Sequence, residues 1–330
     1  MSDVIEILMA ARNGENYIRE QIDSIIAQTD PDWHLTVSDD ASEDATAQII
    51  DGYCARDPDR ISRHCSGRRF GNARDHFFYL MDRCDADWML FCDHDDVWYP
   101  EKVARMRAVM DNATATYGAQ TPILVFSDQT PTDANLTPLA DSLMRYQKQY
   151  FESFDYRSIL MQNVVTGGAM GVNRALAELA RRGKDAGGVI MHDWWLAAVA
   201  ARFGRIVYID APLGVYRQHG GNAIGAKDVG SAGYVASRLG GLREVRQAIL
   251  RKKAQAAAFE RAYGDALDAG DLAFLRAFER PRSGPVFWLK YQGLIHGAAR
   301  KAGMSFTAFH CATRLHSFTR QRNGIPGSSA

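Results

Sequence analysis

Apolar runs of strand character alternate with helical periods along the first two thirds of the chain. Segments of predicted strand are 4–10, 33–38, 61–65, 88–92 and 122–127. Segments in which apolar residues recur three and four positions apart, as in amphipathic helices, are 17–26, 45–53, 72–84 and 101–112. This alternation with short connections predicts an α/β fold with a mostly parallel central sheet and helices on both faces.

The pattern changes after residue 128. Residues 129–150 have no clear period, which is typical of a lid or binding loop. A short helix is predicted over 156–162, and 164–172 contains Thr166-Gly167-Gly168, where adjacent glycines allow either a tight turn or the close approach of a ligand. The remaining predicted elements are an apolar helix that begins at His192 and ends at Gly204, and strands over 205–210 and 214–217.

The C-terminal third is helical in pattern and rich in Ala and Arg. Helices are expected over 238–259 and 271–278, a Pro/Gly linker over 281–285, and two basic apolar segments over 286–301 and 306–320. We therefore predict an α/β domain over 1–225. A helical C-terminal region, basic from residue 281, would follow over 226–330.

Charge is unevenly distributed although the chain as a whole is neutral. Lys+Arg and Asp+Glu are both 39, but residues 281–330 hold seven basic residues and no acidic one, which leaves a net −7 elsewhere. Aromatic and basic residues at helical spacing over 286–322 suggest peripheral contact with an anionic lipid surface. The alternative is that these helices pack on the domain or on a second copy of the chain, so a homo-oligomer stays open. No nucleic-acid partner is expected.

Cysteine usage and hydropathy indicate a reducing compartment. The five cysteines are odd in number and irregularly spaced, which favours reduced thiols. No signal-peptide pattern opens the chain, and no apolar run approaches the ~18 residues of a membrane span. We expect a cytoplasmic protein, with any membrane contact at the inner face.

Three carboxylates follow the apolar segment 88–92. Asp93, Asp95 and Asp96 lie within four positions at the carboxyl end of a predicted strand, where open α/β sheets bind ligands. Carboxylates this close repel one another unless a cation joins them, and oxygen ligands on a short turn suit Mg²⁺ or Mn²⁺. The alternative is an acidic loop in which Asp96 is the N-cap of the next helix.

Two further polar residues stand at the ends of predicted elements. Asp193 lies in the first turn of an apolar helix, where the macrodipole favours an ionised carboxylate that can accept a proton. The alternative role is an N-cap without chemistry. His219 ends a strand and precedes two glycines, so it is either a metal ligand or a turn residue.

Five motifs in this order resemble the inverting nucleotide-sugar transferases of glycosyltransferase family 2, which have the GT-A fold. The resemblance covers residues 4–222. The motifs are Ala-Ala-Arg-Asn-Gly at 10–14, Val-Ser-Asp-Asp-Ala-Ser-Glu-Asp at 37–44, Phe-Cys-Asp-His-Asp-Asp-Val-Trp at 91–98, His-Asp-Trp-Trp at 192–195 and Arg-Gln-His at 217–219. The last two are similar to the rhamnosyltransferase branch.

The resemblance implies roles for individual residues. Asp193 would be the general base, and Asp95 and His219 would hold Mn²⁺ or Mg²⁺. The nucleotide sugar would be bound by Ala11, Arg12, Asn13, Asp39, Asp40, Asp93, His94, Gly168 and Arg217. The donor would be dTDP- or UDP-linked and the acceptor a glycan or lipid-linked saccharide in cell-surface polysaccharide synthesis. Arg12 replaces a tyrosine of the family beside the base, which leaves the nucleotide open.

Two other functions are compatible with parts of the pattern. A sugar nucleotidyltransferase would carry a glycine- and lysine-rich phosphate loop after the first strand, and residues 13–16 contain no lysine. A catalytically silent nucleotide-sugar or glycan-binding module would not need Asp95 and Asp193, and both are present. The sequence therefore favours a transferase.

Overall fold

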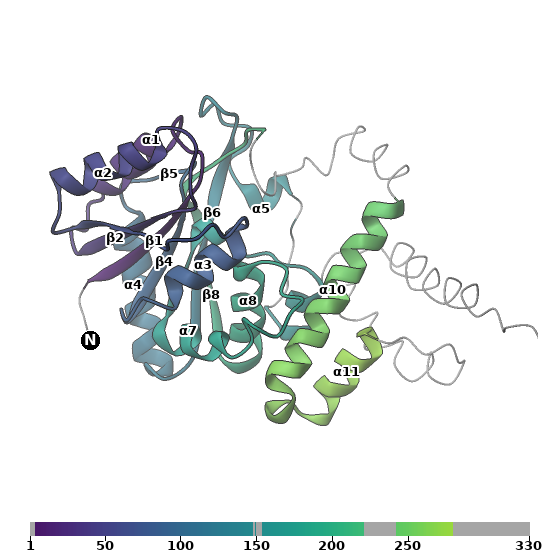
Figure 1. The fold of residues 1–330 in the computed structure, drawn as a ribbon. Coiled ribbons are helices and arrows are strands. Elements are labelled where there is room, and N and C mark those ends of the chain that lie inside the picture. Colours follow the sequence, from purple (N-terminus) through teal and green to yellow (C-terminus); the bar gives the residue numbers. More distant parts are fainter. Residues whose placement is uncertain (1–3, 148, 150–153, 221–241, 280–330) are drawn as a thin grey trace, which may run out of the picture. The chain divides into compact units, whose positions relative to one another are not determined.

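The computed structural model describes residues 4–147, 149, 154–220 and 242–279 (Figure 1). These residues fall into two compact units. The first contains residues 4–147, 149, 163–184 and 191–220, and the second contains 154–162, 185–190 and 242–279. Each unit is described by itself.

The first unit is built on one sheet that has eight strands among the described residues. Its spatial order is β3-β2-β1-β4-β7-β6-β8-β5. The strands are β1 (Ile5–Ala11), β2 (Trp33–Asp39), β3 (Ile61–His64), β4 (Trp88–Asp93), β5 (Val97–Trp98), β6 (Ile123–Thr132), β7 (Met170–Asn173) and β8 (Arg205–Arg217). Strands β1 to β4 pair in parallel, β6 pairs in parallel with β8, and β7 and β5 are antiparallel to their neighbours.

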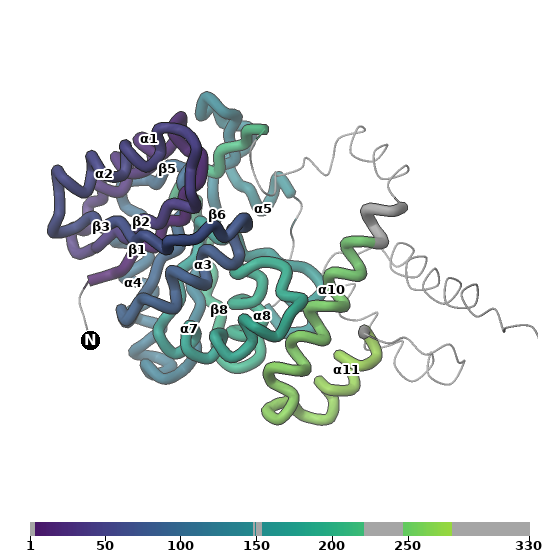
Figure 2. Tube along the Cα trace, in the orientation of Figure 1, coloured from purple at the N-terminus to yellow at the C-terminus, as the bar shows by residue number. Residues whose placement is uncertain are grey.

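Helices cover both faces of this sheet, as predicted (Figures 1 and 2). On one face lie α1 (Ile18–Ile26), α2 (Thr46–Arg56) and α4 (Lys102–Tyr117), whose buried apolar residues share a core with alternate residues of β1, β2 and β4. On the other face lie α3 (Ala73–Met81), which contacts β1, and α7 (Arg174–Arg181) and α8 (His192–Phe203), which contact β6 and its neighbours. Burial on both faces explains why β1 and β4 are nearly continuous apolar runs.

Three elements of the first unit differ from the sequence prediction. The segment 129–150 is more ordered than expected, because β6 runs on to Thr132 and is followed by α5 (Leu143–Tyr146). All ten residues of β6 are buried, including the polar ones at its end. Because these polar residues do not alternate with apolar ones, the sequence showed no strand pattern there. Residues 205–217 form a single strand whose register with β6 shifts beside Asp128. Strand β5, of only two residues, was too short to predict.

By residue type and position the sequence predicts Ser42 as the N-cap of α2, and this prediction is wrong. That helix begins at Thr46 with Ala45 in the cap position, and Ser42 Oγ donates a hydrogen bond to Asp39 Oδ1 instead. A side-chain cap does occur on α3, where Asn72 Oδ1 accepts from Asp75 N at 2.9 Å. The error arose because Ser42 suits a cap or a turn equally well by residue type.

The second unit is helical. It contains α6 (Tyr156–Met161), α10 (Leu242–Tyr263), the short 3₁₀ helix η2 (Gly264–Ala266) and α11 (Ala269–Glu279). The Tyr156 ring lies 5.1 Å from that of Phe259 and 6.3 Å from that of Phe274, between centroids. Because of this packing, residues 154–162 belong to the second unit. The two units are therefore not two consecutive segments that meet at the predicted boundary, residue 225.

The described residues bear on the predicted absence of a membrane span and on the predicted reduced thiols. Among the described residues, no helix has the length and apolarity needed to cross a membrane. The four described cysteines, Cys54, Cys65, Cys84 and Cys92, are free, which agrees with the predicted reduced thiols. The basic segment 286–322 lies outside the described residues, and its contact with a membrane stays a prediction.

Candidate active site

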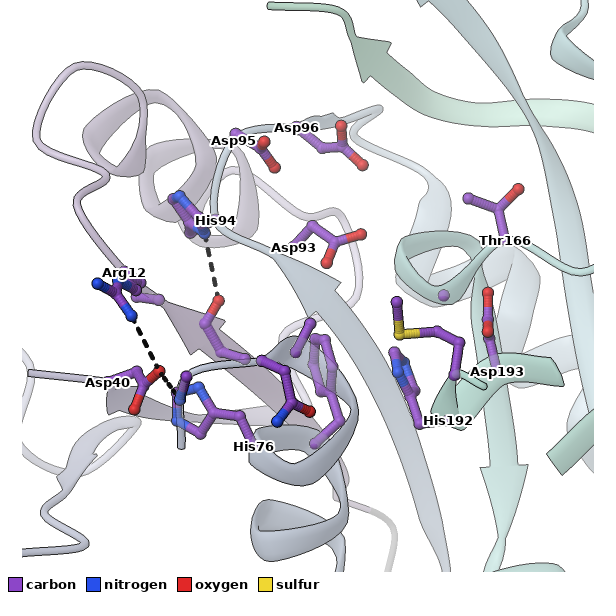
Figure 3. A pocket seen from close by; sticks show the side chains of 18 of the residues that line it. Arg12, Asp40, His76, Asp93, His94, Asp95, Asp96, Thr166, His192 and Asp193 are labelled. Atoms are coloured by element: carbon purple, nitrogen blue, oxygen red, sulfur yellow. Dashed lines mark hydrogen bonds and ion pairs between the residues drawn. The ribbon is translucent and has the colours of Figure 1, made fainter. Parts of the chain in front are cut away.

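A cavity of about 310 Å³ opens in the first unit beyond the carboxyl ends of β1 and β4 (Figure 3). Five carboxylates line it, namely Asp40, Asp93, Asp95, Asp96 and Asp193. They come from three places far apart in the sequence: the end of β2, the turn after β4 and the start of α8. The position agrees with the expectation that ligands bind beyond the strand ends.

Three of these carboxylates, Asp93 at the end of β4 and Asp95 and Asp96 directly after it, form what we call the acidic turn. Burial raises the pKa of Asp93 and of Asp96, and the neighbouring carboxylates raise both further. Asp96 is fixed by two hydrogen bonds, which it accepts at 3.1 Å from Arg217 N and at 3.1 Å from Gln129 Nε2. Asp96 is therefore not a helix N-cap, because β5 separates it from α4 and its oxygens bind elsewhere.

A buried lysine faces this acidic turn, and the sequence analysis missed it. Lys102, the first residue of α4, is 1 % exposed, and its Nζ donates to Gly168 O at 2.7 Å and lies 3.9 Å from the Trp98 ring centroid. Burial lowers the pKa of Lys102 to about 8, while Asp93 and Asp96 favour its charged form. A lysine at a helix start gave no sign in the sequence that it would be buried.

The glycine pair at 167–168 packs against the acidic turn. These residues begin the 3₁₀ helix η1 (Gly167–Ala169). A Cβ on Gly168 would lie 2.9 Å from Asp93 Oδ2 and 3.0 Å from Asp96 Oδ2, and a Cβ on Gly167 would lie 3.8 Å from Asp193 Cβ. Glycine is needed at 168 because a Cβ there would crowd Asp93 and Asp96, whereas the distance from Gly167 to Asp193 is an ordinary contact.

Asp193 is the second residue of α8, and Met191 occupies the cap position. The N-cap alternative is therefore wrong. Asp193 Oδ1 accepts from Trp194 N at 2.6 Å. Burial raises the pKa of Asp193 to about 7, against the lowering effect of its hydrogen bonds. We expected the helix terminus to keep this carboxylate ionised at neutral pH. The structure corrects this expectation, because desolvation disfavours the charged form more strongly than the terminus favours it.

Asp95 and His219, which the family resemblance assigns to a metal, lie in contact, and their binding of a metal stays a prediction. His219 Nε2 lies 2.8 Å from Asp95 Oδ2, and the His219 ring lies 4.5 Å from that of Tyr17. Within the described part of the chain, no group of three or more His, Cys, Asp or Glu is arranged to hold a metal by itself. The Asp95 carboxylate nevertheless suits Mn²⁺ or Mg²⁺, which commonly complete their coordination with substrate phosphates and water.

A second polar group lines the cavity near the end of β2. Asp40 is 3 % exposed and accepts hydrogen bonds from Phe70 N and, at 2.9 Å, from Gly71 N. Arg12 Nη1 lies 3.8 Å from Asp40 Oδ2. His94 also lines the cavity, with Nδ1 3.3 Å from Ala10 O. Ala11, Arg12, Asp40 and His94 thus border the same cavity as the acidic turn.

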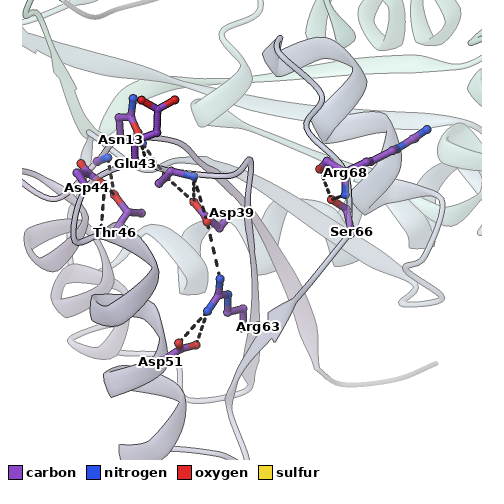
Figure 4. A network of polar contacts seen from close by, with 11 residues as sticks. Asn13, Asp39, Glu43, Asp44, Thr46, Asp51, Arg63, Ser66 and Arg68 are labelled. Atoms are coloured by element: carbon purple, nitrogen blue, oxygen red, sulfur yellow. Dashed lines mark hydrogen bonds and ion pairs between the residues drawn. The ribbon is translucent and has the colours of Figure 1, made fainter.

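Asn13 and Asp39 do not line this cavity. They belong to a polar network that joins the turn after β1 to the loop after β2 (Figure 4). Asn13 N donates to Ser42 Oγ at 2.8 Å, and Asn13 Oδ1 accepts from Glu43 N at 2.9 Å. Asp39 binds Ser42 and lies 3.7 Å from Arg63 Nη2. Their contacts shape the loops that present Arg12 and Asp40, and their predicted contact with nucleotide stays a prediction.

Arg217 also lies outside the cavity lining. Besides its backbone bond to Asp96, its guanidinium binds Glu20 and donates to Ala134 O at 3.1 Å. Arg217 therefore supports the acidic turn, and its predicted contact with nucleotide stays a prediction. Several cavity residues were not singled out from the sequence, because nothing in their local pattern marks them: His76, Phe77, Met191, His192 and Tyr216.

Comparison with known proteins identifies the family. The family model described as Glycosyl transferase family 2 matches residues 6–179, which is more than half of the chain. The chain belongs to glycosyl transferase family 2. Among curated family members, it is 30 % identical over 240 residues to a dTDP-rhamnosyl transferase, RfbG, of Shigella flexneri, covering 71 % of this chain and 79 % of that protein.

Solved structures confirm the GT-A fold expected for this family. The crystal structure of S. aureus TarS residues 1–349 in complex with UDP-GlcNAc is similar with a TM-score of 0.53, at 14 % sequence identity. The similarity covers 99 % of this chain and 94 % of that one. At this identity the likeness establishes the architecture of this family 2 glycosyltransferase and nothing about its substrates.

Proposed function

We propose that this chain is an inverting glycosyltransferase that moves rhamnose from a nucleoside-diphosphate donor to a hydroxyl of a glycan or lipid-linked saccharide in cell-surface polysaccharide synthesis. One observation carries the proposal. A single cavity is bordered by Arg12 and Asp40 on one side and by Asp193 on the other, with Asp93 between them (Figure 3). This order matches nucleotide, diphosphate and sugar along an extended donor.

The chemistry follows from the position of Asp193. Its carboxylate takes the proton of the acceptor hydroxyl while the hydroxyl oxygen forms a bond to the anomeric carbon. In the same displacement the bond between that carbon and the diphosphate oxygen breaks, and the diphosphate leaves on the opposite side. One in-line displacement inverts the anomeric centre and requires no covalent intermediate with the protein.

The acidic turn serves the diphosphate end. Asp95 and His219 would hold Mn²⁺ or Mg²⁺, which when bound supplies positive charge against the leaving phosphates. Asp93 and Asp96 line the same end of the cavity, and Asp96 is held by Arg217 and Gln129. With Lys102 buried beneath the turn, these contacts keep the carboxylates in place when no substrate is bound.

The donor assignment rests on similarity. The Shigella flexneri relative is named a dTDP-rhamnosyl transferase, so dTDP-rhamnose is the donor to test first, with UDP-sugars as the alternative. Arg12 beside Asp40 offers a guanidinium that can stack on a pyrimidine base. The competing function is a catalytically silent binding module. Turnover of any nucleotide sugar in the transfer assay would exclude it.

The test is a transfer assay with a panel of dTDP- and UDP-sugars, with Mn²⁺, with Mg²⁺ and with excess EDTA. The proposal predicts release of nucleoside diphosphate with one donor, loss of turnover in EDTA, and a product whose anomeric configuration, read by NMR, is opposite to that of the donor. Binding without turnover for every donor and metal would establish the silent module. Retention of configuration would contradict the single displacement.

A further inference from the structure

The imidazole of His192 lies in the cavity without a hydrogen-bond partner. His192 is the first residue of α8, directly before Asp193, and both side chains line the cavity (Figure 3). It is 4 % exposed, and neither Nδ1 nor Nε2 has a partner among the described residues. Leaving a buried polar group unpaired disfavours the folded state, because the group loses its hydrogen bonds to water and gains none. A ligand group that pairs with the ring would remove this cost.

The surroundings of His192 keep the ring neutral. It packs against the rings of Phe77 and Phe91, at centroid distances of 4.2 and 5.4 Å. Burial among these apolar groups lowers the pKa of His192 to about 3. A neutral imidazole carries one N–H donor and one acceptor nitrogen, which suits a hydroxyl, since a hydroxyl can both donate and accept. The ring is too weakly basic to replace Asp193 as the base.

The position of the ring points to the donor sugar. A Cβ on Gly167 would lie 3.0 Å from His192 Nε2, and the next residue, Gly168, lies against Asp93. The helix η1 thus lies between the acidic turn and Asp193, and the His192 ring lies beside it. An in-line displacement requires the transferred sugar in this region, since the diphosphate lies on one side of it and the base on the other.

We propose that His192 determines donor specificity by hydrogen-bonding one hydroxyl of the transferred sugar. This inference rests on the proposed function, because it places a nucleotide sugar in the cavity. The adjacent cavity wall is formed by Phe77 and Met191, whose side chains offer that hydroxyl no strong partner. A sugar that lacks the hydroxyl leaves the imidazole unpaired, and a site of this kind discriminates against such a sugar.

The experiment combines substitution of His192 with deletion of single hydroxyls from the donor. The donor is the dTDP- or UDP-sugar that the wild-type protein turns over, and its deoxy analogues lack one ring hydroxyl each. We measure kcat/KM for each donor with the wild type, with His192→Phe, which keeps a flat ring without nitrogens, and with His192→Gln, which restores a donor and an acceptor. The matched control is His64→Phe, because His64 Nε2 is also unpartnered but lies on β3, away from the cavity.

The proposal predicts coupling at one hydroxyl. The wild type and the His64→Phe variant lose about tenfold or more in kcat/KM when that hydroxyl is removed, in line with a lost hydrogen bond of about 1.4 kcal/mol. His192→Phe shows a similar loss with the intact donor and is insensitive to the same deletion. His192→Gln recovers part of the activity and part of the sensitivity, which a purely structural role would not produce.

Two results would overturn the inference. One is equal sensitivity of wild type and His192→Phe to every deoxy donor, provided that both bind the free nucleoside diphosphate equally well. The other is coupling to deoxy acceptors in place of deoxy donors, which assigns the ring to the acceptor. Failure of the wild type to turn over any donor would be a different outcome, because it overturns the proposed function itself.

Discussion

At the scale of single residues, burial sets the chemistry of Asp193. Its pKa is raised to about 7, so the carboxyl is protonated in mildly acidic solution and becomes a base only as the pH rises. We expect kcat/KM to increase about tenfold per pH unit below pH 7 and to level off above it. A pH–rate profile measures this. A flat profile from pH 5 to pH 8 would show that Asp193 is not the group that accepts the proton.

The same shift predicts how stability depends on pH. The folded state retains the Asp193 proton up to about pH 7, whereas the unfolded chain releases it near 3.8. The stability contributed by the protonated form is complete below 3.8 and is lost as the pH rises towards 7. Asp193→Asn removes this loss, so its melting temperature relative to wild type should rise between pH 5 and pH 8. A constant difference across that range would contradict the buried, protonated carboxyl.

Lys102 is the residue whose removal should cost most stability. Its charge lies beneath Asp93 and Asp96, and its Nζ binds Gly168 O. Lys102→Met leaves the buried Gly168 carbonyl without its donor and removes the positive charge near Asp93 and Asp96, and an unpaired buried polar group costs about 1–3 kcal/mol. Chemical denaturation of Lys102→Met and of Arg105→Met, an exposed control on the same helix, measures the difference. Equal midpoints for both variants would show that Lys102 does not stabilise the turn.

At the scale of elements, η1 sets the width of the site. Gly168→Ala places a methyl group 2.9–3.0 Å from carboxylate oxygens of Asp93 and Asp96, so η1 or the acidic turn has to move. We expect transfer activity to fall at least tenfold, because small displacements of catalytic groups are costly. Gly52→Ala in α2 is the control, since a Cβ there meets nothing within 4 Å and alanine favours a helix. Equal activity of both variants would refute the tight packing of η1.

Much of the fold was predictable from the sequence because it depends on local pattern. The strands β1 and β4 are buried and mostly apolar, β2 alternates apolar with polar residues, and Asp95 and Asp193 stand near element ends where binding groups are expected. The burial of Lys102, the packing of His192 against Phe77 and the close contact of Gly168 with Asp93 were not predictable. These contacts join segments more than 60 residues apart, which a local pattern does not contain.

At the scale of the whole molecule, the charge asymmetry gives a separate prediction. Residues 281–330 carry seven basic groups and no acidic one, and each basic group near an anionic membrane contributes about 1 kcal/mol at most. The full chain should therefore co-sediment with anionic liposomes at low salt and be released at high salt. Neutral liposomes are the control. Equal binding to both liposome types, or none to either, would favour packing of this segment on protein.

The central claim is that one cavity holds the donor and that Asp193 activates the acceptor within it. The most direct test is single-turnover transfer by Asp193→Asn compared with wild type, with the donor saturating for both as judged by calorimetry. The account predicts unchanged donor affinity and a transfer rate lower by about 10²–10⁴-fold. A variant that binds the donor equally well and transfers the sugar at the wild-type rate would contradict it.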